Sequence, residues 1–150
     1  MNTSAAINAY NKVGVESKVT GADPHKLVSM LFEGALLAIA KAKNGIMRND
    51  IPVKSDAIFK ASSIINEGLR ASLDMKVGGE LAQNLAALYE YMITRLVAAN
   101  MNNDVRILDE VSNLLAGLKD AWDSIRPSVM QSSAAQSRPA SVPESAKEKA

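Results

Sequence analysis

Four segments with helical periodicity follow one another along most of this chain, and short turns separate them. Ala, Leu, Met, Lys and Glu dominate these segments, and the alternation of apolar and polar residues that marks a strand is missing. Helices of about 20 residues that are joined by short turns must pack as antiparallel neighbours. The sequence therefore predicts an all-α protein with the architecture of an antiparallel up-down four-helix bundle.

Local start and stop signals place the first two helices. The first helix is expected to begin at Asp23-Pro24, where an N-capping side chain precedes a proline at the first helical position, and to end near Arg48. Residues 49–52 then form a turn, and the second helix should continue to Leu73. A polar stripe along this second helix is spaced to form one solvent face.

The same signals place the last two helices. Gly78-Gly79 is expected to end the connection, so that the third helix runs from Glu80 to about Met101. The fourth helix should end before Pro127. On the second helix, the polar stripe puts Arg70 within reach of Glu67 and Asp74, with which it is expected to pair.

Three regions are expected along the chain: an N-terminal arm (1–22), the four-helix bundle (23–126) and a C-terminal tail (127–150). A chain of 150 residues suffices for one domain with one sizeable core. The tail is rich in Ser, Ala and Pro and has few side chains to bury, which predicts disorder.

Composition narrows the classes of partner. Lys plus Arg (17) nearly balances Asp plus Glu (16), so no net field attracts nucleic acid or an anionic membrane. The chain has no cysteine and its N-terminus lacks the blocks of a signal peptide. The longest apolar run, residues 34–40, is far shorter than the roughly 20 residues of a membrane span. We therefore expect a cytoplasmic protein that binds no nucleic acid and inserts into no membrane.

The third predicted helix has two neighbouring apolar seams where a bundle needs one. The first seam comprises Leu81, Leu85, Leu88, Met92, Leu96 and Ala99, and the second comprises Ala82, Ala86, Tyr89, Ile93 and Val97. The fourth helix repeats the arrangement with Leu108, Val111, Leu115, Leu118, Trp122 and Ile125, widened by Ile107, Leu114 and Ala121. The surplus apolar surface must be covered by something.

Helical periodicity does not show what covers this surplus apolar surface. Small residues such as Ala82 and Ala86 fit tight packing within the bundle itself. Alternatively, the surplus forms a groove for amphipathic partner helices. A third interpretation is a structural or regulatory bundle that forms a homodimer through the same surface.

Enzymatic chemistry has little support in the sequence. The one histidine, His25, falls in the first turn of the first helix and is expected to be solvated. There is no Glu-x-x-His pair for a di-iron site, no Gly-rich phosphate loop and no nucleophile with a base. We expect no catalytic residues, no metal and no cofactor.

Several motifs, in a fixed order, resemble the family of flagellar secretion chaperones, FliS. They run from Ala9-Tyr10, through residues 23–35 (DPHKLVSMLFEGA), Leu73-Asp74 and residues 78–82 (GGELA), to Asn84-Leu85, residues 88–92 (LYEYM), Asn100, Asn103-Asp104 and Ala121-Trp122. Phe32 stands where the family usually has tyrosine. The resemblance covers most of the predicted folded part of the chain.

This resemblance implies a function for the surplus surface. FliS-like proteins are helical bundles that bind the C-terminal segment of newly made flagellin, prevent its premature polymerisation and deliver it to the flagellar type III export apparatus. It further implies docking on the cytosolic domain of the export-gate protein, and a chaperone that is a monomer or a weak homodimer when free. No covalent chemistry is implied.

The residues expected to contact flagellin come from the arm and from the last two helices. They are Ile7, Tyr10, Leu85, Tyr89, Ile93, Val97, Leu114 and Leu118. Ile7, Tyr10 and Val13 recur at three-residue steps, so the arm is expected to cover part of the groove in the free protein and to move when flagellin binds. A frayed terminus with incidental apolar residues is the alternative.

Overall fold

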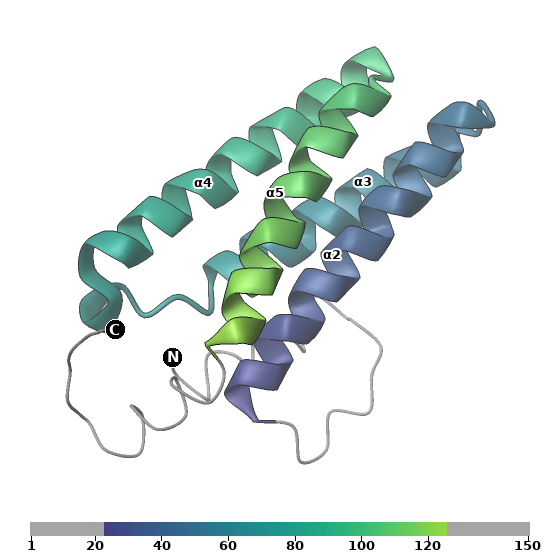
Figure 1. Cartoon of the computed structure of the whole chain (residues 1–150). Coiled ribbons are helices and arrows are strands. Elements are labelled where there is room, and N and C mark those ends of the chain that lie inside the picture. Colours follow the sequence, from purple (N-terminus) through teal and green to yellow (C-terminus); the bar gives the residue numbers. More distant parts are fainter. Residues whose placement is uncertain (1–22, 126–150) are drawn as a thin grey trace. The chain divides into compact units, whose positions relative to one another are not determined.

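Figure 1 shows the protein as a computed structural model, in which residues 23–125 are described. In chain order the elements are α2 (Pro24–Met47), α3 (Ile51–Ser63), the π-helix η1 (Ile64–Arg70), α4 (Met75–Asn102) and α5 (Val105–Ser124). The chain divides into two compact units, residues 1–119 and 120–150, and the described part of the first holds every helix except the last residues of α5. No residue in 23–125 lies in a strand, which confirms the all-α class.

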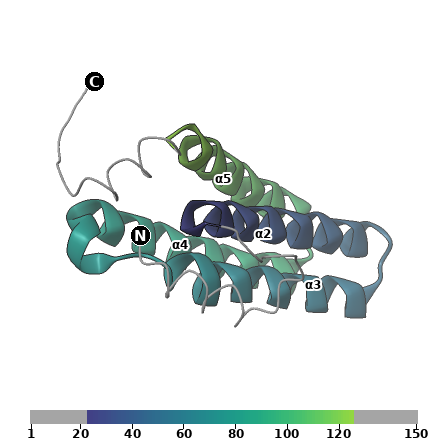
Figure 2. The same ribbon diagram turned by 90° about the horizontal axis from the view of Figure 1, so that it is seen from below.

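The helices of the first unit alternate in direction along the chain (Figures 1 and 2). α2 lies along α3, and η1 packs between α2 and α4. Lys43 on α2 pairs with Asp109 on α5 at 3.0 Å, and Arg95 on α4 pairs with Glu110 on α5 at 2.8 Å. These contacts complete the predicted up-down bundle. Every helix in residues 23–125 is too short or too polar to cross a lipid bilayer.

The turn between α2 and α3 is shorter than the predicted turn of residues 49–52, because α3 already begins at Ile51. Asp23 begins α2, because its carboxylate accepts a hydrogen bond of 2.7 Å from the Lys26 amide. Asn49 adopts a left-handed conformation (φ 59°) after the helix ends. The Asp50 carboxylate then accepts a hydrogen bond of 3.3 Å from the Val53 amide and begins α3. Both helix starts are therefore fixed by local side chains.

The second predicted helix changes its winding at Ile64. From there to Arg70 it is a π-helix, whose wider turns rotate later residues about the axis relative to an α-helix. Arg70 therefore pairs with Glu90 on α4 at 2.7 Å, and it also donates to Asn66. The expected pairing of Arg70 with Glu67 and Asp74 on its own helix is wrong.

The start of α4 differs from the prediction. The Asp74 carboxylate accepts hydrogen bonds from the amides of Lys76 (3.2 Å) and Val77 (3.1 Å), so a helical turn begins at Met75, ahead of the predicted start at Glu80. A kink follows at Gly79, whose backbone (φ 54°, ψ −130°) lies in a region that side chains with a Cβ avoid. The non-helical Gly79 separates this first turn from the long regular helix that follows from Glu80, as expected; the turn that Asp74 caps ahead of it was not predicted.

The core is formed by one apolar stripe from each element. Its fully buried side chains are Leu27, Leu31, Ile64, Ile65, Leu69, Met92, Leu96, Leu108, Val111 and Leu115. His25 joins this interior with only 3% of its surface exposed, so the expectation that it is solvated is wrong. The reason is its register: His25 lies three and seven residues before Val28 and Phe32, on the buried face of α2.

A buried cation connects the two hairpins of the bundle. Lys54, in the first turns of α3, is only 6% exposed. Its Nζ donates to the backbone oxygen of Asn100 (3.1 Å) and to Oδ1 of Asn103 (2.7 Å), at the C-terminus of α4. This position is favourable for a cation because the helix dipole is negative there. α2 approaches the Lys54 backbone so closely that a Cβ at Gly45 would lie 2.8 Å from its amide nitrogen.

Replacing Gly79 with alanine tests the kink of α4. We expect Gly79→Ala to lower the free energy of unfolding by about 1–3 kcal/mol, because alanine is strained at this backbone conformation. Gly117→Ala is the matched control, since a Cβ there meets open space in a helix and should stabilise by about 0.5–1 kcal/mol. Urea unfolding measures both, and equal effects of the two substitutions would contradict the strain.

Candidate client-binding surface

The structure describes six of the eight residues expected to contact flagellin. Leu85 and Ile93 on α4 are half-buried, as are Leu114 and Leu118 on α5. Val97 is 52% exposed. Tyr89 is 3% exposed, so its ring belongs to the interior beneath the surface. The other two residues, Ile7 and Tyr10, lie outside the described residues.

Leu85, Leu88, Leu114 and Leu118 form a surface that we call the α4–α5 seam. On a helical wheel, Leu85 falls between Met92 and Leu96, which are fully buried, yet Leu85 itself is only half-buried. Leu118 lies close to the buried Val111 on the core side of α5 and is also half-buried. Apolar residues that point toward the bundle are therefore incompletely covered along this stretch.

The pairing of α4 with α5 sets these residues at the same level. Arg95 and Glu110 are in contact, and the two helices run in opposite directions. On α4, Leu88 lies seven residues before Arg95, and on α5, Gly117 lies seven residues after Glu110. Leu88 is thus level with the turn of α5 that carries Leu114 and Leu118.

Ile93 and Val97 belong to a different side of α4, which we call the α4 flank. On the helical wheel they fall between Glu90, which pairs with η1, and Asn100, which accepts from Lys54 of α3. Arg95 and Tyr91, which contact α5, are on the opposite side. Ile93 and Val97 therefore lie on a different side of α4 from Leu85 and Leu88.

A polar cluster that sequence reasoning missed borders the seam. The Glu110 carboxylate accepts hydrogen bonds from the Tyr91 hydroxyl and from Arg95 Nε, the latter at 2.8 Å. These bonds, with that from Tyr91 the larger cause, hold the pKa of Glu110 below its usual range. The hydrogen bond to Glu110 in turn raises the pKa of Tyr91. Only the pairing of α4 with α5 brings these side chains together, so no local sequence signal marks them.

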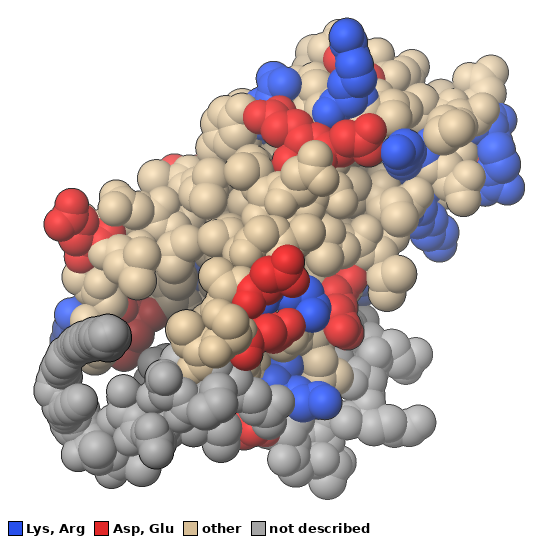
Figure 3. All heavy atoms as spheres, viewed as in Figure 1, with Lys and Arg blue, Asp and Glu red and all other residues tan. Residues whose placement is uncertain are grey.

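Charges are unevenly distributed on the face that α4 and α5 share. Figure 3 shows an uncharged stretch over the middle of this face, with acidic and basic side chains gathered near the turn from α4 to α5 and again near the other end of α5. Across residues 23–125, no group of three or more His, Asp or Glu side chains is arranged to hold a metal ion. The face offers apolar contact area and hydrogen bonds, which suit the binding of another polypeptide.

The lowered pKa of Glu110 predicts a pH dependence. Its native carboxylate is favoured over the unfolded one, so its contribution to stability is complete above the usual pKa of about 4.3 and is lost as pH falls through the lower native value. We expect the stability difference between the natural protein and Glu110→Gln to be largest near neutral pH and to shrink in acid.

Urea unfolding at several pH values between about 7 and 2 measures this difference. Tyr91→Phe removes one of the two hydrogen-bond donors to Glu110 and keeps Arg95. Its stability difference from the natural protein should therefore also shrink in acid, but it should be smaller than that of Glu110→Gln. Curves for the natural protein and Glu110→Gln that stay parallel over the whole pH range would refute the assignment.

The fold is an all-α helical bundle that carries incompletely buried apolar residues along α4 and α5. The sequence matches the family described as flagellar protein FliS over residues 6–129. The chain therefore belongs to the FliS family, and its role is that of a chaperone in flagellar export.

Individual relatives cover most of this chain and most of their own length. The flagellar secretion chaperone FliS of Salmonella typhimurium is 46% identical over 127 residues, 85% of this chain and 94% of that protein. Flagellar secretion chaperone FliSB of Pseudomonas aeruginosa is 48% identical over 125 residues, 83% and 98% of the two chains. The Bacillus subtilis FliS chaperone is 36% identical over 107 residues, 71% and 78% of the two chains.

Proposed function

We propose that this protein binds the C-terminal segment of flagellin, prevents its premature polymerisation and delivers it to the export apparatus by docking on the export gate. Membership of the FliS family supports a chaperone role, and the apolar surfaces on α4 and α5 supply a means of binding. The client segment would bind as one or more amphipathic helices, with apolar residues on the α4–α5 seam or the α4 flank.

The half-buried Leu85 is the observation that carries this proposal. A residue that lies between Met92 and Leu96 on the helical wheel would be buried in a closed bundle, and it is not. A client helix that covers the seam removes Leu85, Leu88 and their partners on α5 from water. The client's own self-association surface is hidden at the same time.

Reversible release is compatible with this mode of binding. A client segment that folds as it binds loses conformational freedom, which costs about 2–5 kcal/mol of the gross interaction energy. The complex is then weaker than its buried area alone implies. A chaperone that must release its client at the export apparatus benefits from that cost.

Two pairs of substitutions test which surface binds the client. Leu85→Gln with Leu118→Gln changes the seam, and Ile93→Gln with Val97→Gln changes the flank. A pair that lies in the interface should weaken the binding of a flagellin C-terminal peptide by about tenfold or more, because central apolar contacts each contribute about 1–2 kcal/mol. Isothermal titration calorimetry gives the affinity, and circular dichroism shows whether the bundle stays folded.

The two pairs also control for each other, since both replace branched apolar residues with glutamine. Light scattering with and without the peptide should show a 1:1 complex. Unchanged affinity for both folded variants would refute the proposed surface. A tight dimer that is indifferent to the peptide would instead favour a self-associating bundle.

The arm supplies a further test of the proposal. If Ile7 and Tyr10 cover part of the surface in the free protein, deletion of residues 1–15 should raise the association rate constant of a labelled flagellin peptide and increase self-association of the free chaperone. If they contact the bound client, the same deletion should raise the dissociation rate constant. Stopped-flow fluorescence measures both constants, and unchanged values would remove the arm from the mechanism in either form.

A further inference from the structure

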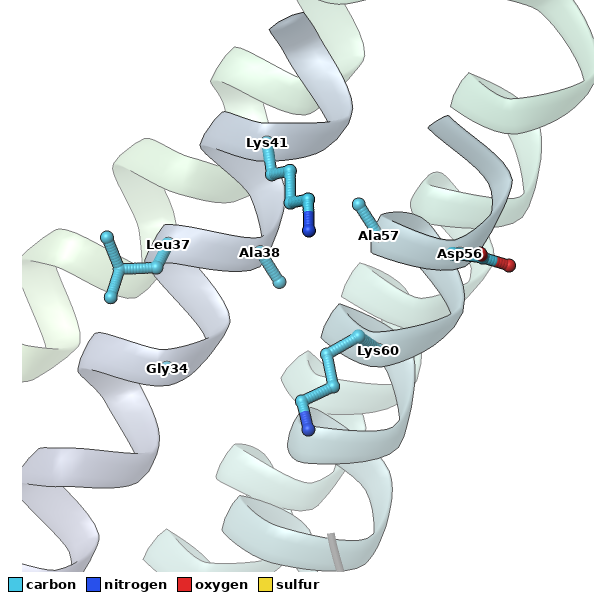
Figure 4. Close-up of a pocket in the computed structure, with 7 residues that line it drawn as sticks. All are labelled: Gly34, Leu37, Ala38, Lys41, Asp56, Ala57 and Lys60. Carbon is cyan, nitrogen blue, oxygen red and sulfur yellow. The ribbon is translucent and has the colours of Figure 1, made fainter. Parts of the chain in front are cut away.

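A second concave surface lies between α2 and α3, outside the candidate surface on α4 and α5. It is a cleft of about 420 Å³, and Figure 4 shows the residues that line it. Gly34 and Ala38 from α2 and Ala57 from α3 form its floor. Because these residues are small, another molecule can approach both helices closely here.

Each of the two helices carries a large, exposed apolar side chain beside this cleft. Leu37 on α2 is 72% exposed, and Phe59 on α3 is 73% exposed. Figure 4 shows Leu37 pointing away from the gap on the α2 side, and Asp56 pointing away from it on the α3 side. Phe59 lies one turn after Asp56 and therefore on the same side of α3. The cleft thus has one exposed apolar residue on each of its outer borders.

A charged residue accompanies each of these apolar residues, and the two charges are opposite in sign. Lys41 lies one turn after Leu37 on α2, and Asp56 lies one turn before Phe59 on α3. Both charged side chains are exposed. Neither takes part in the ion pairs between residues 23–125.

The packing of α2 on α3 sets these residues at matching levels. A Cβ at Gly45 would lie 2.8 Å from the Lys54 amide nitrogen, so these two residues are level. Because the helices are antiparallel, counting away from this pair puts Lys41 within about two residues of the level of Asp56. The same count puts the two apolar side chains within about three residues of one level. The two helices therefore present the same pattern, with the sign of the charge exchanged.

We propose that Leu37, Lys41, Asp56 and Phe59, which we call the α2–α3 face, bind a second copy of this chain. A two-fold axis parallel to the helices lays α2 of one copy on α3 of the other and leaves every residue at its level. Leu37 then contacts Phe59 of the second copy. Lys41 pairs with Asp56 of the second copy, and each contact occurs twice, as in every two-fold interface.

The distribution of charge favours a second copy over an unrelated partner. A partner helix of one sign that lies along the cleft would attract either Lys41 or Asp56 and would repel the other at the same level. A second copy that is related by the two-fold axis matches both charges and both apolar residues. The face is therefore complementary to itself.

The association is expected to be weak. Exposed ion pairs contribute little, and only two apolar contacts are repeated across the axis, so we expect a dissociation constant on the order of 100 μM. At low micromolar concentrations the protein is then a monomer, which agrees with a 1:1 client complex. The α2–α3 face lies outside the seam and the flank on α4 and α5, so the dimer does not require the flagellin assignment.

Sedimentation equilibrium of the full-length protein at concentrations from about 10 to about 500 μM tests this interface. We expect Leu37→Gln with Phe59→Gln to weaken dimerisation by about tenfold or more, because both apolar contacts are lost. Leu81→Gln with Met101→Gln is the matched control, since both residues are similarly exposed but lie on α4, and it should leave the dissociation constant unchanged. Circular dichroism shows whether each variant stays folded.

Exchange of the charges gives a result that a misfolded variant cannot imitate. Lys41→Glu alone and Asp56→Lys alone bring like charges together, so each should weaken the dimer by about threefold or more. The two substitutions combined restore the pairs with their signs exchanged and should return the dissociation constant to nearly its natural value. Lys76→Glu on α4 is the control for net charge, because Lys76 is exposed and lies outside the α2–α3 face.

Three results would overturn the proposal. The first is a natural protein that stays monomeric up to about 500 μM. The second is a dimer that the seam pair, Leu85→Gln with Leu118→Gln, weakens and the folded Leu37→Gln, Phe59→Gln variant does not, which would place the second copy on α4 and α5. The third is a combined charge variant that dimerises no better than either single variant. Failure of a flagellin peptide to bind would leave these comparisons intact and would count only against the flagellin assignment.

Discussion

The rest of the bundle depends on the hydrogen bonds that the buried ammonium of Lys54 makes to the end of α4. A cation removed from water is costly unless it is well paired, and here the C-terminus of α4 supplies a backbone oxygen and the Asn103 side chain. The Lys54 backbone also contacts α2 at Gly45. One residue of α3 thus holds both of its neighbours, α2 and α4, at the end of the bundle where the two short turns lie (Figure 1).

Toward the other end of α5, Lys119 pairs with Glu33 of α2 at 4.0 Å, and the Glu33 side chain is largely exposed. Moving from Arg95 and Glu110 toward the start of α4, apolar side chains on the core side change from buried to half-buried, as Met92 and Leu85 show. A bundle that is fixed at one end and incompletely covered at the other combines a stable fold with apolar area for a partner. If the proposed client binds at the α4–α5 seam, stability and binding depend on different ends of the same helices.

Much of the fold follows from local sequence signals, because helix caps act within a few residues. Asp23 begins α2 where the sequence predicts, Asp50 begins α3 two residues earlier than the predicted turn allows, and each helix contributes the expected apolar stripe. The sequence-based predictions fail where distant contacts or a π-helix determine the local structure. The π-helix turns Arg70 toward Glu90, and Asp74 nucleates a turn ahead of Gly79. Periodicity assumes regular α-helix and misses both.

The candidate site was harder to predict than the fold. The sequence shows that α4 has surplus apolar residues, but it does not show which side of the helix each neighbour covers. Only the contacts of Tyr91 and Arg95 with Glu110, and of Glu90 with Arg70, separate the seam from the flank. Tyr89, which periodicity assigns to the surface, is buried.

The position of Lys54 also has a consequence for the order in which the chain folds. Each turn, α2 to α3 and α4 to α5, closes over few residues, so each hairpin can form early from local contacts. The bonds from Lys54 to Asn100 and Asn103 join residues 46 and 49 positions apart. Until the hairpins dock, this ammonium is hydrated; in a misaligned assembly it would be dehydrated without acceptors. A single buried charge thereby penalises wrong pairings of the two hairpins and favours the native register.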